Sequence, residues 1–363
     1  MNVDRMNIVE ATRDYERWLS SHTQLLASQL RRKHELMRTG AFPFLRATFY
    51  RWAQTFPQVC PELAAGPNVL GVGDLHVENF GTWRDAEGRL VWGVNDFDEA
   101  SPQPYANDLV RLVASGLLAG RQAVLALNQA AVAEAVLEGY RDGLREGGLP
   151  FLLGEKNKRL LQMAHGELRA PAVFWKKMEG LKRLRKVPKP AADALESLLP
   201  AKGLPVRFAG RICGLGSLGH QRYVALVEWR GAMIAREAKA TAPSAAVWAR
   251  RANSKEVLYE KILSRAVRCP DPFVGVVGGW VVRRLSPDCS RIELADLPVK
   301  RDESRLLYCM GWETANIHLG TPQVRKTVLA GLGKRPGWLL QASRNMMEAV
   351  LSDWKQWRRA TDG

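Results

Sequence analysis

Two polar motifs stand at the two ends of a predicted β-hairpin: residues 73–80 read GDLHVENF, and residues 95–99 read NDFDE. A short apolar run, typical of a buried strand, comes directly before the first motif. The chain between the motifs reads as two strands joined by the turn sequence DAEG. Because a hairpin brings its two ends together, we expect Asp74, Asn79 and Asp96 to meet at one site.

The residue types in these motifs are those that phosphoryl transfer requires. A carboxylate such as Asp74 orients the attacking hydroxyl and accepts its proton, while the Asn79 amide oxygen and the Asp96 carboxylate hold Mg²⁺ on nucleotide phosphates. We expect His76 and Asp98 to support these groups. The simpler interpretation is that both aspartates are turn residues at strand ends, but the complete spacing around one hairpin favours the site.

The same D-x-H sequence also opens the metal site of binuclear phosphohydrolases. That class needs an Asn-His pair and further histidines as metal ligands. The chain has six histidines, and none follows an asparagine. A metal-dependent phosphohydrolase is therefore the less favoured interpretation of Asp74 and His76.

A glycine-rich segment over residues 214–221 reads GLGSLGHQ. A P-loop is excluded because Lys and Ser or Thr do not follow the last glycine. A dinucleotide-binding turn opens a helix, whereas a strand is predicted here. A loop that joins two antiparallel strands over nucleotide phosphates fits this context better than a plain hairpin turn. The expected nucleotide contacts are at Gly214, Gly216, Ser217 and Gly219.

A glycine loop of this kind predicts a phosphate-binding lysine on the following strand, and Lys239 is the candidate. Arg236 is the alternative, and the two side chains point to opposite faces of a strand. A helix predicted over about 244–266 offers a carboxylate to hold the lysine. Glu256 and Glu260 are one turn apart on that helix, and we prefer Glu256.

Composition indicates a globular protein with an anionic partner. The 363 residues are 46% hydrophobic and 25% charged, which excludes a disordered chain. The formal net charge of +16 favours nucleotides, nucleic acids or acidic substrates, and argues against a cationic acceptor. Five cysteines without a C-x-x-C pair indicate a reducing cytoplasm. The sequence contains no long uncharged apolar run, so we predict no membrane span.

Much of the positive charge lies in residues 154–189, with eleven Lys or Arg against three Glu. The default interpretation is a solvated helical face. The alternative is a surface for nucleic acid or another acidic partner, with Phe174 and Trp175 as stacking platforms.

The chain divides into three parts, which predicts an α+β class. Residues 1–200 are mainly helical and contain both polar motifs. Residues 201–300 are rich in β-strand and contain the glycine loop. Residues 301–363 are helical again, so the β-rich part is inserted between helical parts.

The two polar motifs resemble the catalytic and metal-binding motifs of aminoglycoside-phosphotransferase-like kinases. The longer pattern is similar to an uncharacterised bacterial family, domain of unknown function 2252. This resemblance implies a bilobal protein-kinase-like fold that uses ATP and Mg²⁺. It makes Asp74 the catalytic aspartate and Asn79 and Asp96 the Mg²⁺ ligands, and it implies that Asp108 braces the catalytic loop.

The chain departs from that pattern in two ways. Val72 precedes Gly73, where many such kinases have histidine. The glycine loop follows the catalytic loop by about 140 residues, although in ordinary kinases it comes first. We interpret this order as a circular permutation, with the nucleotide lobe over about 203–299. The predicted function is phosphoryl transfer from ATP to the hydroxyl of an unidentified acceptor, and the alternative is a catalytically weak binder of nucleotides or nucleic acid.

Overall fold

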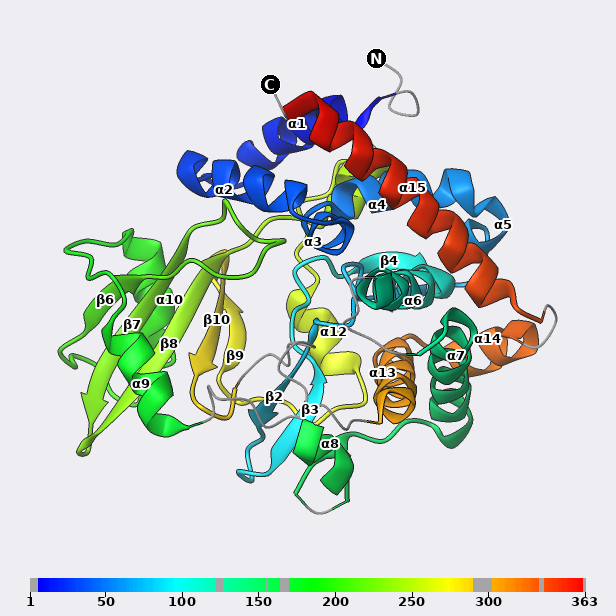
Figure 1. The fold of residues 1–363 in the computed structure, drawn as a ribbon. Coiled ribbons are helices and arrows are strands. Elements are labelled where there is room, and N and C mark those ends of the chain that lie inside the picture. Colours follow the sequence, from blue (N-terminus) through cyan, green and yellow to red (C-terminus); the bar gives the residue numbers. More distant parts are fainter. Residues whose placement is uncertain are drawn as a thin grey trace.

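The computed structural model describes residues 6–121, 127–154, 156–163, 170–289, 302–332 and 336–361. Figure 1 shows a five-stranded sheet beside a body of helices, with the predicted hairpin between them. Helices and strands occur in both halves of the chain, which confirms the α+β class. Within the described residues, no helix is both long enough and apolar enough to cross a membrane.

The five-stranded sheet is antiparallel, with the strand order β6-β7-β8-β10-β9. Arg230 and Gly231 both have positive φ, as the two-residue turn between β7 and β8 requires. The glycine-rich segment joins β6 to β7, as the sequence predicts. The strands are β6 Arg207–Gly210, β7 Arg222–Trp229, β8 Ala232–Ala240, β9 Val274–Val277 and β10 Trp280–Leu285.

Two helices that precede residue 200 pack on this sheet. Phe174 and Met178 of α9 (Pro171–Glu179) join the buried side chains of one part of the sheet. Ala191, Ala194 and Leu195 of α10 (Lys189–Ser197) cover another part. Lysines and arginines surround these apolar positions in the sequence. The basic segment therefore contains helices that cover the sheet, although its composition suggests a solvated surface.

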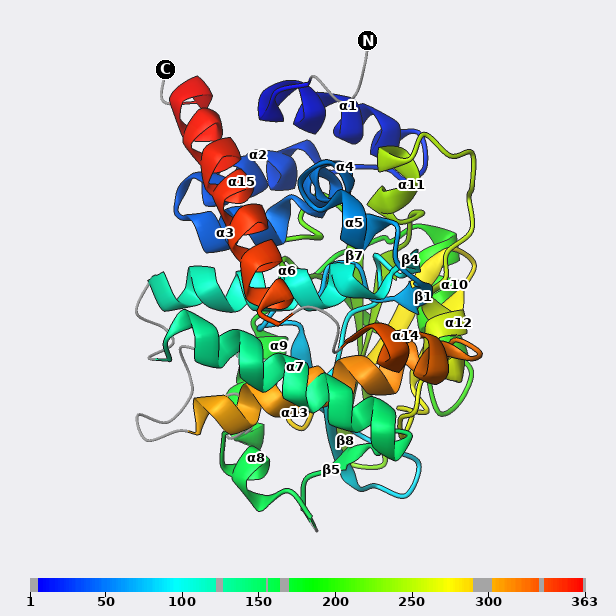
Figure 2. The same cartoon turned by 90° about the vertical axis from the view of Figure 1, so that its right-hand side faces the viewer.

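The other helices form one body with a continuous apolar core. Its centre is α6, which is buried from Tyr105 to Ala119. Figure 2 shows α15 lying across α6, and α7 beside α13. The C-terminal helices therefore return to the helices that precede the sheet. The members are α1 Ile8–Ser20, α2 Ala27–Arg38, α3 Ala41–Ala47, α4 Phe49–Val59, α5 Pro61–Ala64, α6 Tyr105–Arg121, α7 Gln129–Glu146, α8 Lys158–Met163, α11 Ala245–Ala249, α12 Tyr259–Arg265, α13 Glu303–His318, α14 Val324–Leu332 and α15 Trp338–Thr361.

The predicted hairpin is present as β2 (Phe80–Arg84) and β3 (Leu90–Val94), and β5 (Phe151–Leu152) extends it. The strand before the first motif, β1 (Asn68–Gly71), pairs with β4 (Ser101–Pro104). Both motifs are therefore connected to short strands at each end, and those strands fix their positions.

The helix predicted over 244–266 is wrong in its middle. The structure has two short helices, α11 (Ala245–Ala249) and α12 (Tyr259–Arg265), and the segment between them is not helical. Arg251 has a φ of 53°, a conformation that ends a right-handed helix. The Asn and Ser that follow it favour turns over helix interiors.

Candidate phosphoryl-transfer site

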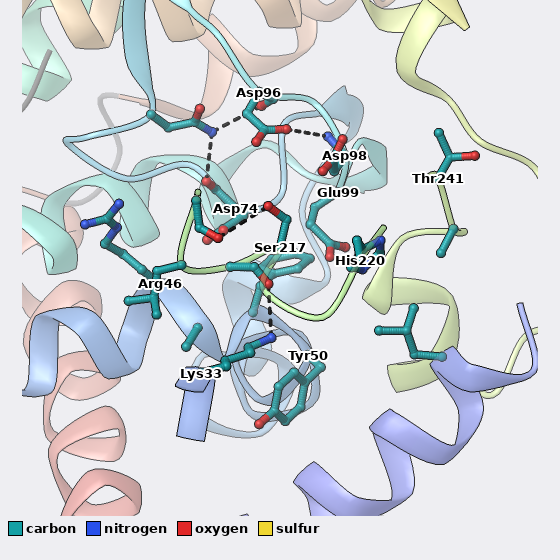
Figure 3. Close-up of a pocket in the computed structure, with 18 of the residues that line it drawn as sticks. Lys33, Arg46, Tyr50, Asp74, Asp96, Asp98, Glu99, Ser217, His220 and Thr241 are labelled. Atoms are coloured by element: carbon teal, nitrogen blue, oxygen red, sulfur yellow. Dashed lines mark hydrogen bonds between the residues drawn. The ribbon is translucent and has the colours of Figure 1, made fainter. Parts of the chain in front are cut away.

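The two polar motifs and the glycine loop line one pocket between the sheet and the helical body (Figure 3). The strand-end motifs contribute acidic and amide side chains, and the glycine loop forms the opposite wall. The sequence analysis predicts that the motifs and the loop meet, although more than 100 residues separate the second motif from the glycine loop. The expected residues that line the pocket are Asp74, His76, Asn79, Asp96, Asp98, Gly214, Gly216 and Ser217.

Asp108 holds the chain directly before Asp74. Its carboxylate is fully buried and accepts hydrogen bonds from the backbone N–H of Val72 at 2.7 Å and of Gly73 at 2.9 Å. The Gln103 amide also donates to it at 2.7 Å, and His318 Nε2 lies 3.0 Å away. These partners fix the turn that follows β1, where Gly73 has a φ of 83°.

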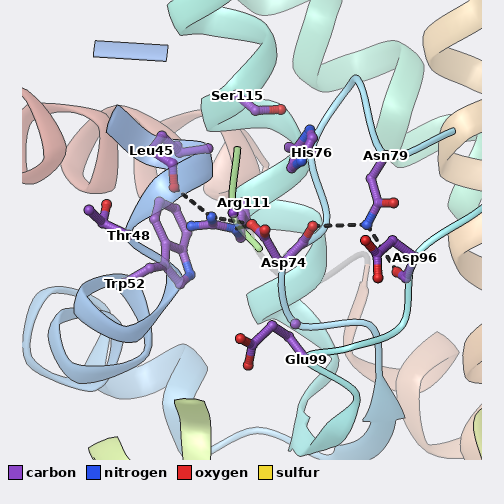
Figure 4. Close-up of polar contacts among 12 residues, drawn as sticks. Leu45, Thr48, Trp52, Asp74, His76, Asn79, Asp96, Glu99, Arg111 and Ser115 are labelled. Atoms are coloured by element: carbon purple, nitrogen blue, oxygen red, sulfur yellow. Dashed lines mark hydrogen bonds and ion pairs between the residues drawn. The ribbon is translucent and has the colours of Figure 1, made fainter. Parts of the chain in front are cut away.

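Asp74 is oriented by a buried arginine (Figure 4). Arg111 lies on α6, has no exposed surface and forms an ion pair with Asp74 Oδ1. The guanidinium also donates to the Leu45 carbonyl at 2.8 Å and lies over the rings of Phe49 and Trp52. Burial raises the pKa of Asp74, and Arg111 opposes this increase. The arginine therefore occupies one carboxylate oxygen and favours the ionised form of the group, against the effect of burial.

Asn79 is the clearest candidate for a metal ligand. Its Nδ2 donates to the Asp74 carbonyl at 3.0 Å and to the Asp96 carbonyl at 3.1 Å, so the direction of the amide is fixed. Its Oδ1 is buried and has no hydrogen-bond partner among the described residues. A buried amide oxygen without a partner is costly, and Mg²⁺ prefers hard oxygen ligands. The residues present therefore fit a magnesium ion beside Asp96.

Lys239 forms ion pairs with the second motif. Its Nζ is 3.4 Å from Asp96 Oδ1 and also contacts Asp98. Burial, together with Asp96, raises the pKa of Asp98 to about 6, although Lys239 opposes the increase. Arg236 lies elsewhere, with its guanidinium 3.0 Å from the Leu198 carbonyl and over the Phe273 ring. Of the two candidate cations on β8, only Lys239 contacts these aspartates.

The prediction that Glu256 or Glu260 holds Lys239 is wrong. Glu256 lies outside any helix, is exposed and forms an ion pair with Lys261 at 3.4 Å. Glu260 accepts a hydrogen bond from the Val276 N–H at 2.7 Å. Neither carboxylate contacts Lys239, because the segment after α11 does not continue the helix on which both were placed. Asp96 and Asp98 take that role.

The glycine loop lies close to Asp74. A Cβ on Gly216 would lie 3.0 Å from the Arg46 carbonyl and 3.3 Å from Asp74 Oδ2, which is tighter than usual. Gly214 and Gly219 have φ values of 76° and 106°. Glycine at these positions thus has a local cause, which is positive φ or close approach of the backbone.

Other predicted residues have structural partners. Ser217 Oγ accepts a hydrogen bond from Arg222 at 2.8 Å, and Arg222 is paired with Glu237 at 2.6 Å. The Nδ1 of His76 accepts a hydrogen bond from the Glu78 N–H at 3.2 Å. His76 also packs edge-on against Phe42.

Sequence reasoning missed two cationic pocket residues, and it left a third residue, Glu99 of the second motif, without a definite role. Lys33 and Arg46 come from helices near the N-terminus, and both line the pocket. Glu99 accepts hydrogen bonds from Ser244 Oγ at 2.9 Å and from the Ala245 N–H at 2.6 Å, and burial raises its pKa to about 7. Arg111, which orients Asp74 without lining the pocket, was also missed. It had a usable signal, since it lies three residues after Asp108 on the predicted helix and shares its face.

The stacking role suggested for the basic segment is not supported. Phe174 is buried against the sheet, and Trp175 is partly buried beside it. In the part of the chain that the structure describes, no three His, Cys, Asp or Glu side chains form a metal-binding group. All five cysteines are free thiols.

Comparison with known proteins adds one finding. Residues 25–163 match the model of a family described as "Uncharacterized protein conserved in bacteria (DUF2252)". The matched region contains both polar motifs, Asp108 and Arg111, and it ends before the five-stranded sheet. No curated protein and no solved structure matches the chain.

Proposed function

We propose that this chain is a magnesium-dependent phosphotransferase that moves the γ-phosphoryl group of ATP to a hydroxyl of an acceptor. The observation that carries the proposal is the buried Oδ1 of Asn79, which has no hydrogen-bond partner in the described parts of the chain. Asn79 and Asp96 line the same pocket as the glycine loop. Bound Mg²⁺ would neutralise charge on the nucleotide phosphates. Asn79 and Asp96 would hold it.

The arrangement of the sheet supports a kinase-like, circularly permuted architecture. The glycine loop joins β6 to β7, and Lys239 is on the next strand, β8. Protein kinases likewise have a glycine loop followed by a phosphate-binding lysine on the third strand. Here these elements follow the catalytic motifs in sequence, but the glycine loop lines the same pocket as those motifs. Lys239 pairs with Asp96 and Asp98, which line that pocket. A permutation accounts for both facts, since it changes the chain order and keeps the arrangement in space.

The chemistry follows from the positions of Asp74 and Arg111. The acceptor oxygen forms a bond to the γ-phosphorus while the bond from that phosphorus to the bridging oxygen breaks, and ADP leaves. Arg111 occupies Asp74 Oδ1, so Oδ2, which faces the glycine loop, is the oxygen that receives the hydroxyl proton. Lys239 would contact the phosphates once its pairing with Asp96 and Asp98 loosens around the ion.

The acceptor is neutral or anionic in this account. The chain has a net charge of +16, which disfavours a cationic substrate. Lys33 and Arg46 add positive charge to a pocket that four carboxylates also line. The free cysteines fit our placement of the reaction in the cytoplasm.

One observation favours a second function, nucleotide binding without transfer. The ion pair with Arg111 reduces the basicity that burial gives to Asp74, and such a site can hold a nucleotide without reaction. Transfer of labelled phosphate from ATP to a panel of hydroxyl compounds separates the two. Asp74→Asn is expected to abolish labelled product and to keep ATP affinity. Absence of product for the wild type across the panel, with ATP still bound, would favour the binder.

A further inference from the structure

Helix α2 buries a lysine on an otherwise solvated helix. Lys33 and Met37 are its only buried residues, and they are one turn apart. Arg31 and Arg32, directly before Lys33, are exposed. In the sequence the three cations resemble one solvated run. Lys33 is nevertheless only 5% exposed, and its side chain points into the pocket (Figure 3).

The ammonium group of Lys33 has few partners for a buried cation. It donates one hydrogen bond to the Gly216 carbonyl at 3.0 Å and lies 6.0 Å from the centre of the Tyr50 ring. Among the described residues it forms no ion pair. Burial lowers its pKa, which shows that the surrounding protein does not compensate the charge fully. An ammonium has three donors, so two remain for a ligand.

Lys33 also lies near the reacting groups. Its partner Gly216 is the residue of the glycine loop at which an added Cβ would lie 3.3 Å from Asp74 Oδ2. Lys33 therefore bonds to the part of the glycine loop that lies nearest Asp74, and all three residues line the pocket. A phosphate under this loop and beside Asp74 would lie close to the Lys33 ammonium.

We propose that Lys33 binds the γ-phosphate of the nucleotide and stabilises the phosphoryl group during transfer. The proposal rests on the proposed function and deepens it. Charge spreads over the equatorial oxygens of the transferring group, and a cation at that position lowers the barrier. The residues between Asp74 and Asn79 include no lysine or arginine, so α2 supplies the cation from outside the motif.

The competing explanation is that Lys33 only fixes the glycine loop through the Gly216 carbonyl. A loop-fixing residue affects every nucleotide that lies under the loop. A γ-phosphate ligand affects ATP and leaves ADP unchanged. The ratio of the two affinities therefore separates the roles without any measurement of turnover.

Isothermal titration with Mg·ATP and Mg·ADP on the full chain tests the proposal. Lys33→Met is expected to weaken ATP binding by about tenfold to a hundredfold, the loss of one charge-assisted hydrogen bond, and to change ADP binding by less than about twofold. Lys33→Gln, which keeps a donor for Gly216, is expected to do the same and serves if Lys33→Met does not fold. Arg32→Met, on the exposed face of α2, is the matched control and is expected to match the wild type.

Equal losses for ATP and ADP in both Lys33 variants would assign Lys33 to the loop and overturn the proposal. Unchanged affinity for both nucleotides would also overturn it. Failure of the wild type to bind either nucleotide would instead refute the proposed function. Lys239→Met provides a further reference, because a lysine on the α- and β-phosphates is expected to weaken ATP and ADP together.

Discussion

The ion pair between Arg111 and Asp74 offers a quantitative test of how the site is built. Arg111 has no exposed surface, and its guanidinium contacts Asp74, the Leu45 carbonyl and two aromatic rings. Arg111→Met keeps most of the side-chain volume and removes the charge. The substitution leaves the Asp74 carboxylate, whose side chain is 20% exposed at the pocket, without its cation.

The expected cost is large. Removal of one partner of a buried ion pair destabilises a protein by about 3–5 kcal/mol. Asp74→Asn strands Arg111 in the same way and should cost a similar amount. In the double variant neither charge is left alone, so its loss should fall short of the sum of the single losses by about 1.5–3 kcal/mol. Arg121→Met, at the exposed end of α6, is the control and should stay within about 0.5 kcal/mol of the wild type.

Urea unfolding of the four variants measures these free energies, with matched m values as a check on the comparison. The pH dependence has a defined sign. Without Arg111, burial and the charge of Asp96 raise the pKa of Asp74 further above the unfolded value, and Arg46 is the cation that still opposes them. A raised carboxyl pKa means that stability is lost as pH rises through it, so Arg111→Met should be less harmful at pH 5 than at pH 8. Additive losses in the double variant would refute the pairing.

Two further predictions concern the strand ends and the pocket. Gly73 and Gly88 both have positive φ, but an added Cβ clashes with the Glu99 carbonyl only at Gly73. Gly73→Ala should therefore lower the free energy of unfolding in urea by about 1–3 kcal/mol more than Gly88→Ala. Equal losses for the two variants would contradict the packing around Gly73. Burial raises the pKa of Glu99 from 4.5 to about 7, so its ionisation destabilises the folded state as pH rises over that range. The stability of Glu99→Gln relative to the wild type should increase from pH 5 to pH 8, and a flat difference would contradict the raised pKa.

The parts of the fold with local signals were predictable. Alternating apolar residues and the Arg230-Gly231 turn defined β7 and β8, and the hairpin between the motifs has the expected turn. Helices α9 and α10 were not assigned to the sheet. Their apolar faces consist of a few residues such as Phe174 and Leu195 among many cations, and only tertiary contact shows what they cover.

The site divides in the same way. Asp74, Asn79 and Asp96 share a pocket because a hairpin joins their motifs, which is a short-range geometric reason. The prediction of a glutamate partner for Lys239 was wrong because it required a continuous helix through residues 250–258. Lys33 was not found at all, since a buried lysine and a surface lysine look alike in a sequence.

The central claim, a magnesium-dependent nucleotide site at Asp96, is tested most directly by thermal unfolding with ATP in the presence and absence of Mg²⁺. A ligand at about 100 times its dissociation constant stabilises by ~2.7 kcal/mol. At ~2.1 cal/mol/K of unfolding entropy per residue, this raises Tm by about 3–4 °C for a chain of this length. We expect that shift for the wild type and for the surface control Asp193→Ala, only with Mg²⁺, and its loss in Asp96→Ala. An equal shift without Mg²⁺, or one that survives Asp96→Ala, would contradict the account.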